Sequence, residues 1–223
     1  MASCNICDGT RFETFRGRPF EKCSQCGSLA RHRTGWLVYQ HHLLDTAVAR
    51  GRILHLAPEP WLYPLLKERL ASGYITADAY PEVYPHAPCL KLFFPQDFSI
   101  FPDGYFDAIL HNHVLEHIPG HYGDHLEAFT RLLSPGGRMI FSIPGPYKGV
   151  PTREGGENLA SDAERLEKFL QEDHYKMFGD DFVPRVQSLA GGQLVDDGVD
   201  DEMRERIQVR PGKARFYVWQ KDG

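Results

Sequence analysis

The sequence predicts an α/β protein with a mostly parallel sheet covered by helices on both faces, preceded by a small cysteine-rich segment. Two observations predict this class. Short apolar runs alternate with helical patterns from residue 34 onward, and four of the five cysteines lie within residues 4–26. Alternating strands and helices are typical of a parallel sheet. The last two apolar runs have a shorter connection, which predicts an antiparallel strand at the end.

Length and composition set the broad class. The chain has 223 residues, of which 42% are hydrophobic and 25% charged. This composition is typical of a globular domain with an appendage and excludes a disordered chain or a coiled coil. No apolar run reaches the ~18 residues of a membrane span, and the first residues do not resemble a signal peptide. We therefore expect a cytoplasmic protein with reduced thiols and no membrane partner.

The charge is unevenly distributed. Residues 1–36 contain six Lys or Arg and three acidic residues, which gives +3 and leaves −8 of the total charge of −5 for the remainder. Two interpretations stay open at this point. The basic segment can be an ordinary solvated surface, or it can contact an anionic substrate or partner.

The cysteines form two Cys-x-x-Cys pairs. Fifteen residues separate the pairs, a spacing typical of a four-cysteine zinc ribbon or knuckle, with a small hairpin around Gly17 between them. A closed site of this kind stabilises the fold and does not take part in chemistry. Disulfides and a redox motif are the alternatives, but nothing indicates export. We expect a zinc-binding region over residues 1–33, with Cys4, Cys7, Cys23 and Cys26 as ligands.

The second region, residues 34–223, contains the elements of the predicted sheet. A helix over 34–50 follows from apolar residues at helical spacing, and Gly51 ends it. The sequence Pro135-Gly136-Gly137 closes a later helix. Further helices are predicted at 59–71, 122–133, 160–172 and 181–190. Apolar runs predict strands at 53–56, 74–78, 90–94, 106–110, 138–143, 193–196 and 214–220.

Two sequence blocks resemble a known enzyme family. Phe106-Asp107-Ala108-Ile109-Leu110-His111-Asn112-His113-Val114-Leu115-Glu116-His117-Ile118 resembles the fourth-strand motif of class I S-adenosylmethionine (SAM)-dependent methyltransferases. Arg131-Leu132-Leu133-Ser134-Pro135-Gly136-Gly137-Arg138-Met139-Ile140 resembles the helix, turn and fifth strand that follow. With residues 101–107, these blocks resemble the methyltransferase type 11 group. The resemblance covers residues 50–145 and implies a Rossmann-like sheet, SAM as cofactor and methyl transfer.

The first-strand motif departs from the family pattern, which has an acidic residue followed by a glycine-rich loop. Here the stretch is His55-Leu56-Ala57-Pro58-Glu59-Pro60. Ala57 is small enough to let the backbone approach the cofactor, and Pro58 fixes a rigid turn. Glu59 either binds the methionine ammonium group or caps the next helix. His55 either replaces the missing acidic residue or packs in the core.

The remaining cofactor residues follow from the resemblance. Asp78 ends the second strand, where a carboxylate accepts hydrogen bonds from the ribose hydroxyls. Ala79 and Tyr80 follow it, and Tyr80 is a candidate for flanking the adenine. The other adenine candidates, after the third strand, are Asp97 and Phe98. The residues expected on the methionine side are Asn112 and His113.

Histidines around residue 113 carry two possible functions. His113, Glu116 and His117 match the metalloprotease motif H-x-x-E-H, which requires a helix through all three residues. Pro119-Gly120 stops any helix within a turn, so this interpretation is not favoured. As the general base of a methyltransferase, the predicted order is His113 first, His117 second and His174 third.

The acceptor is the least determined part of the prediction. Residues 145–190, inserted after the fifth strand, are expected to form the substrate wall and lid. Together with the basic zinc region they favour a small anionic or sugar-containing metabolite. The alternatives are an RNA methyltransferase that grips phosphates with that region, and a non-catalytic binding protein that has lost its cofactor. The expected acceptor contacts are Tyr147, Lys148, Arg153, His174, Tyr175 and Lys176.

Overall fold

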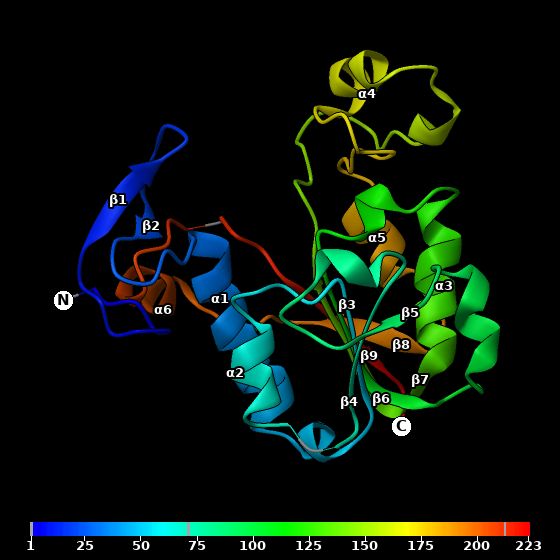
Figure 1. Ribbon diagram of the computed structural model, residues 1–223, viewed down its shortest axis with the longest axis horizontal. Helices are drawn as coiled ribbons and strands as arrows, with labels where there is room; N and C mark the ends of the chain where they lie inside the picture. Colours follow the sequence, from blue (N-terminus) through cyan, green and yellow to red (C-terminus); the bar gives the residue numbers. More distant parts are fainter. Residues whose placement is uncertain (1, 71, 212) are drawn as a thin grey trace.

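The N-terminal part of the protein is a small antiparallel hairpin beside the main sheet. The computed structural model describes residues 2–70, 72–211 and 213–223. Strands β1 (Phe12–Phe15) and β2 (Arg18–Cys23) form the hairpin, with Gly17 at φ 73° in its turn. The hairpin predicted around Gly17 is confirmed, and it lies at one end of the molecule (Figure 1).

The main sheet has the strand order β5-β4-β3-β6-β7-β9-β8, seven strands within the described residues. Strands β3 to β7 pair in parallel, whereas β9 is antiparallel to both of its neighbours. This arrangement confirms the predicted Rossmann-like α/β fold with an antiparallel last strand. The strands are β3 (Ile53–Leu56), β4 (Tyr74–Asp78), β5 (Cys89–Lys91), β6 (Phe106–Asn112), β7 (Leu133–Ser142), β8 (Gly192–Val195) and β9 (Tyr217–Lys221).

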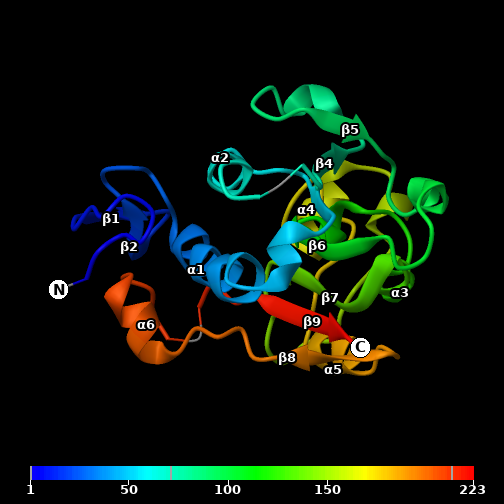
Figure 2. The same ribbon diagram turned by 90° about the horizontal axis from the view of Figure 1, so that it is seen from below.

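Helices cover both faces of the sheet (Figures 1 and 2). Helices α1 (Ala30–Tyr39) and α2 (Tyr63–Lys67) pack one face, where Tyr39 and Leu66 meet Leu110. Helices α3 (Tyr122–Leu132) and α5 (Phe182–Gln187) pack the other, where Phe129 and Phe182 join Phe141. Successive residues of a strand face opposite sides of the sheet. Strand β6 therefore contributes side chains to the apolar core on each face.

Shorter elements complete the chain. Helix α4 (Asp162–Phe169) stands apart from the helices that cover the sheet in Figure 1. Helix α6 (Asp201–Arg206) lies beside the N-terminal hairpin in both views, and Ser3 N donates to the carbonyl of Arg206 at 2.8 Å. A π-helical turn spans Gln40–Leu44, and 3-10 turns span Ala47–Arg50, Pro81–Val83, Gln96–Ile100, Leu115–His117 and Gly156–Asn158.

One predicted helix is shorter in the structure, and one observed helix was not predicted. The helix expected over 59–71 is reduced to α2, because residues 60–62 and 68–69 form turns instead; residue 71 lies outside the described residues. Helix α6 was not predicted. The proposed boundary after residue 33 falls inside α1, which runs through it without interruption. Among the residues that the structure describes, no helix is long and apolar enough to cross a membrane.

Candidate functional site

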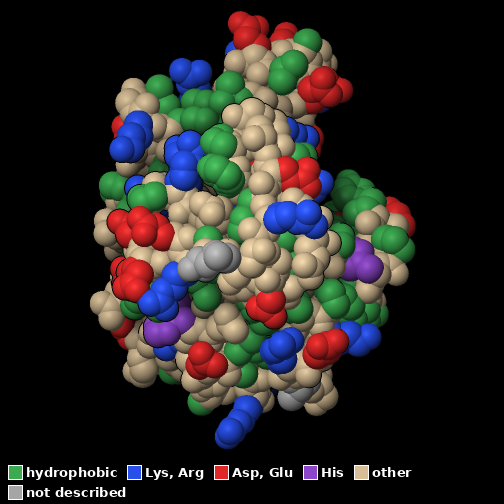
Figure 3. Space-filling view, turned by 90° about the vertical axis from the view of Figure 1, so that its left-hand side faces the viewer, with side chains coloured by type: hydrophobic (Ala, Val, Ile, Leu, Met, Phe, Trp, Pro, Cys, Tyr) green, Lys and Arg blue, Asp and Glu red, His purple; other side chains and the backbone are tan. Residues whose placement is uncertain are grey.

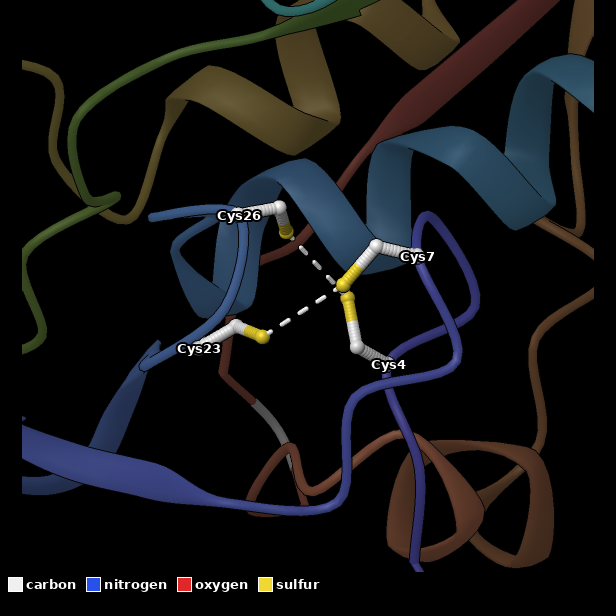
Figure 4. Close-up of side chains that lie close together, drawn as sticks. All are labelled: Cys4, Cys7, Cys23 and Cys26. Atoms are coloured by element: carbon white, nitrogen blue, oxygen red, sulfur yellow. Dashed lines mark hydrogen bonds between the residues drawn. The ribbon is translucent and has the colours of Figure 1, made fainter.

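Four cysteines gather around one point in the N-terminal region (Figure 4). Their sulfur atoms lie within 4.8 Å of one another, and the pairs Cys4–Cys26 and Cys7–Cys23 are each 3.7 Å apart. Zinc–sulfur bonds of about 2.3 Å in a tetrahedron place sulfurs about 3.8 Å apart, whereas a disulfide bond measures about 2.0 Å. Burial raises the pKa of the Cys26 thiol, but hydrogen bonds from Ser28 outweigh it and lower that pKa to about 7. The cluster therefore has the dimensions of a four-thiolate metal site.

The loop after β3 replaces the missing glycines with a strained alanine. Ala57 adopts a left-handed backbone at φ 50°, a region that favours glycine. Glu59 turns back toward the strand end, with its Oε2 3.4 Å from Nε2 of His55. His55 is fully buried and its Nδ1 lies 2.7 Å from the hydroxyl of Tyr74. The N-cap of α2 is Leu62, without a side-chain cap, so Glu59 does not cap that helix.

Asn112 links this loop to the end of β6. It is 5% exposed, and its Nδ2 donates to the hydroxyl of Tyr39 at 2.7 Å and to Oε2 of Glu59 at 3.1 Å. Its Oδ1 accepts from Ser142 at 3.1 Å. The carboxylate of Glu59 is thereby held between the carboxyl ends of β3 and β6, where open α/β sheets bind their ligands. Sequence reasoning missed Tyr39 and Ser142, whose proximity depends on tertiary packing.

Asp78 lies at the carboxyl end of β4, beside an exposed pair of aromatic rings. Its Oδ1 accepts from the backbone N–H of Tyr80 at 2.8 Å, which orients the carboxylate. Ala79 is half-buried. Tyr80 is 59% exposed and meets Phe93 edge to face at 6.2 Å between ring centroids. These two rings form an apolar wall next to the carboxylate.

The residues predicted after the third strand have local roles. Phe98 is 1% exposed and packs against Phe129 in the core, so it does not present a face to a ligand and its predicted adenine contact is not supported. Asp97 accepts from the backbone N–H of Phe93 at 2.8 Å, which positions that ring. Pro58 is buried, and its carbonyl accepts from Nε2 of His86 at 2.7 Å.

His113 follows Asn112 and also has a left-handed backbone, at φ 52°. Its Nδ1 lies 3.3 Å from Oε1 of the buried Glu116. His117 and His174 meet edge to face at 4.9 Å on the other side of that carboxylate. The three histidines predicted as bases therefore lie around one glutamate. Of the three, His113 is the one that also borders a cleft.

The cleft has a volume of about 550 Å³ and is strongly basic. Its walls come from the hairpin, the start of α1, the ends of β6 and β7, and residues 208–210 and 213–215 of the C-terminal segment. Glu21 is its single acidic lining residue among those described. The tail cations were not predicted as site residues, although three of them fall within six positions of the sequence. The basic lining residues are Arg18, Arg31, Arg210, Lys213 and Arg215.

Most residues expected to contact the acceptor lie elsewhere. Tyr147 borders the cleft, but Lys176 is fully buried and donates to the carbonyl of Ile118. Burial lowers the pKa of Lys176 to about 8. Arg153 pairs with Met177 in an isolated β-bridge. The hairpin and the C-terminal segment thus supply the basic wall that residues 145–190 were expected to supply.

Comparison with known proteins identifies the family. The profile of a family described as "Methyltransferase domain" matches residues 35–183, and the chain belongs to this family. It is a methyltransferase. A search of curated proteins finds no significant match.

Solved structures show the same fold at low sequence identity. A SAM-dependent methyltransferase from Archaeoglobus fulgidus is 12% identical, with a TM-score of 0.55 over 86% of this chain and 94% of that one. The 1,6-didemethyltoxoflavin-N1-methyltransferase of Burkholderia thailandensis, bound to S-adenosylhomocysteine, is 16% identical, with a TM-score of 0.50 over 87% and 79%. A methyltransferase in complex with the Trm112 activator from Haloferax volcanii is 15% identical, with a TM-score of 0.51 over 84% and 89%.

Proposed function

We propose that this methyltransferase transfers the methyl group of SAM to an anionic small metabolite bound in the basic cleft. The observation that carries the proposal is the cleft itself. Five cations and one acidic residue line a volume of about 550 Å³ beside His113. Arginine forks bind carboxylate and phosphate groups in two-point contacts, which gives geometric selectivity as well as charge. This chemistry favours an anionic acceptor over a neutral sugar.

The cofactor edge is proposed to lie along the carboxyl ends of β3, β4 and β6. When bound, SAM supplies a methyl group on a sulfonium centre. Asp78 accepts hydrogen bonds from ribose hydroxyls, and Tyr80 with Phe93 packs against the adenine. Glu59 and Asn112 offer a carboxylate and an amide to the charged methionine end. These residues fit the cofactor, since Asp78 offers acceptors to the ribose hydroxyls and Glu59 offers a negative charge to the methionine ammonium group.

His113 is proposed to lie between the cofactor site and the acceptor cleft. It directly follows Asn112 on the cofactor side and lines the acceptor cleft. Because a methyl transfer of this kind depends on alignment of nucleophile and methyl group, orientation across this boundary supplies much of the rate. His113 is also placed to accept a proton from the acceptor. His55 acts through Glu59 as a positioning residue, since it is fully buried.

The cysteine cluster is proposed to hold structural zinc. Its support is the 3.7 Å spacing of sulfur atoms and the absence of any disulfide among the described cysteines. The hairpin carries Arg18, and Arg31 lies in the first turn of α1. Zinc at this position would therefore fix one wall of the cleft.

RNA is the competing acceptor. Lys and Arg side chains are interspersed with Asp and Glu over the face that carries the N-terminal region (Figure 3). A nucleic-acid surface instead gathers cations in a stripe or patch. The basic residues of this protein are concentrated inside a cleft of small-molecule size, which favours a metabolite.

The proposal is tested by measuring S-adenosylhomocysteine release with three sets of acceptors: phosphorylated or carboxylated metabolites, neutral analogues of each, and RNA. The wild type is expected to turn over an anionic metabolite. Arg31→Gln is expected to raise KM for that acceptor about 10-fold with kcat nearly unchanged, because a hydrogen bond to a charged group contributes about 1.5–3 kcal/mol. The neutral analogues are expected to react poorly with both proteins.

Asp78→Ala separates the cofactor from the acceptor in the same experiment. It is expected to weaken S-adenosylhomocysteine binding about 10-fold or more in a calorimetric titration, whereas Arg31→Gln leaves that binding unchanged. Preferential methylation of RNA, or equal rates with anionic and neutral acceptors, would overturn the acceptor assignment. Failure of the wild type to bind S-adenosylhomocysteine at millimolar concentration would overturn the cofactor site.

A further inference from the structure

A second cluster of metal-ligating side chains lies behind His113, away from the cysteines. Glu116, His117 and His174 each offer a ligand atom within 4.8 Å of the others. We propose that these three residues bind a divalent transition-metal ion. Two imidazoles and a carboxylate are a donor set typical of zinc and of iron or manganese. The proposal does not depend on which acceptor the enzyme uses.

Glu116 gives the strongest indication of a missing ligand. Its side chain is 1% exposed, and neither carboxylate oxygen has a hydrogen-bond partner within the described part of the chain. A buried carboxylate without a partner is costly, and buried charges are normally paired or coordinate metals. The contact from His113 at 3.3 Å has the length of an ion pair without the geometry of a hydrogen bond. The two carboxylate oxygens of Glu116 are thus ligand atoms without a hydrogen-bond partner among the described residues.

The spacing of the ligand atoms suits a small ion. Oε1 of Glu116 lies 4.0 Å from Nε2 of His117, and His174 offers a ligand atom within 4.8 Å of both residues. Zinc bonds of about 2.0–2.2 Å in a tetrahedron place ligand atoms about 3.3–3.6 Å apart. The pair formed by Glu116 and His117 therefore needs to close by about half an ångström. His117 is 37% exposed, so its side chain has room to adjust.

Groups outside the cluster orient the ligands. Nδ1 of His117 lies 3.0 Å from the carbonyl of Asp173, so it carries the proton and the Nε2 lone pair remains for a metal. Metal-binding histidines commonly have such a partner on the second ring nitrogen. The backbone N–H of Tyr175 donates to the carbonyl of Glu116 at 2.8 Å. This bond holds the segment that carries His174 against the turn that carries Glu116.

The cluster accounts for the H-x-x-E-H pattern without assigning a protease function to the protein. The motif begins directly after β6 and ends in a three-residue 3-10 turn over Leu115–His117, and it does not lie on a continuous helix. His113 and Glu116 still meet, because the left-handed backbone at His113 turns the chain back. The remaining ligand, His174, is supplied by a segment more than fifty residues later. The fold thus brings together Glu116 and His117, which belong to the sequence motif, and His174, which does not.

The test is a metal count on the full chain. Each protein is loaded with Zn²⁺, passed through a desalting column and measured for zinc per chain by elemental analysis. Glu116→Gln is expected to hold about one zinc ion fewer than the wild type. The glutamine has nearly the same shape, and the cysteine cluster contributes equally to both proteins. When both proteins are first stripped of metal, added Zn²⁺ is also expected to raise the melting temperature of the wild type more than that of Glu116→Gln.

Two asparagine variants provide a matched pair. His117→Asn removes a ligand that is 37% exposed, so the fold is retained even if Glu116→Gln proves unstable. His121→Asn makes the same change four residues later and keeps the N-cap of α3. His117→Asn is expected to lose about one zinc ion, and His121→Asn none. Equal zinc content in the wild type, Glu116→Gln and His117→Asn, or the same loss in His121→Asn, would overturn the proposal.

Discussion

The N-terminal region and the sheet are stabilised by different kinds of contact. In the hairpin, β1 and β2 are mostly exposed, and the buried positions are concentrated at the cysteines and the start of α1. In the sheet, two apolar clusters fill the space between the strands and the helices on each face. The sheet therefore has a core of its own, whereas the N-terminal region depends on its cysteines. This difference predicts that the two regions respond differently to the same perturbation.

Arg33 is the main polar link between the two regions. Its guanidinium is fully buried and lies 4.7 Å from the ring of Phe12. It donates to carbonyls from three segments: the hairpin, the turn before α1 and the end of α6. The accepting carbonyls belong to Phe20, Glu21, Ser28, Ile207 and Gln208. Both the hairpin and the C-terminal segment that line the cleft are thus fixed to one side chain.

The largest effect is expected from removing metal ligands. Cys23→Ser combined with Cys26→Ser should unfold the N-terminal region, because binding of the proposed zinc would contribute about 10 kcal/mol or more to its stability. Hydrogen exchange measured by mass spectrometry should show loss of protection over residues 2–28, with protection of β6 and β7 retained. This outcome would sharpen the comparison, since one region unfolds while the other stays folded.

Cys89→Ser is the matched control for the cysteine variant. Cys89 is half-buried in β5, outside the cluster, and its substitution should leave the N-terminal exchange rates unchanged. If the N-terminal amides of the double variant exchange as slowly as those of the wild type, the comparison fails and the hairpin is stable without metal.

A smaller effect is expected from Arg33→Lys. Lysine has three donors in place of the five-donor fork, so at least two of the buried carbonyls lose their partner. Each unpaired group costs about 1–3 kcal/mol, which predicts a fall in unfolding free energy of about 2–6 kcal/mol for two groups. Urea denaturation measures this quantity. Arg11→Lys makes the same change at an exposed position of the hairpin and should have no measurable effect. Equal stability of the two variants would show that Arg33 does not couple the regions.

How much the sequence predicts depends on how local each signal is. The strands at 53–56 and 74–78 have the predicted bounds, because short apolar runs between turns carry their own signal. The cysteine cluster is equally local, since the spacing alone brings the pairs together. The polar helix α6 has no apolar stripe, and its signals are the cap at Asp200 and the ion pair between Arg206 and Glu202. Periodicity could not reveal it.

The candidate site was predicted where it follows strand ends and missed where it depends on packing. Asp78 and Asn112 lie at the strand ends where the sequence placed them. Glu59 was selected from the loop after the first strand, but its contact with Asn112 spans 53 positions and could not be anticipated. Lys176 was expected to contact the acceptor, yet the fold buries it. The direction in which a side chain faces depends on the neighbours that the fold supplies.

The smallest effect concerns a buried histidine of the sheet. His111 is stacked between Phe129 and Phe141 at 4.9 and 4.8 Å and is fully buried. Burial, with a smaller contribution from His55, lowers the pKa of His111 to about 3. The unfolded chain takes up a proton near pH 6.5 and the folded chain does not. Stability from this group is therefore fully present above pH 6.5 and is lost as the pH falls from 6.5 toward 3.

His111→Phe tests this contribution by removing the titrating ring from an aromatic stack. Between pH 7.5 and 5.5 the wild type should lose about 1.4 kcal/mol of unfolding free energy more than the variant does, because a full unit of differential protonation corresponds to about that amount. Urea denaturation at the two pH values gives the difference, and other buried histidines cancel in it. His41→Phe replaces an exposed imidazole and should keep the wild-type pH dependence. Parallel pH profiles for the wild type and His111→Phe would mean that the buried ring takes up its proton over the same pH range in the folded and the unfolded protein, and that the sheet core accommodates a charge.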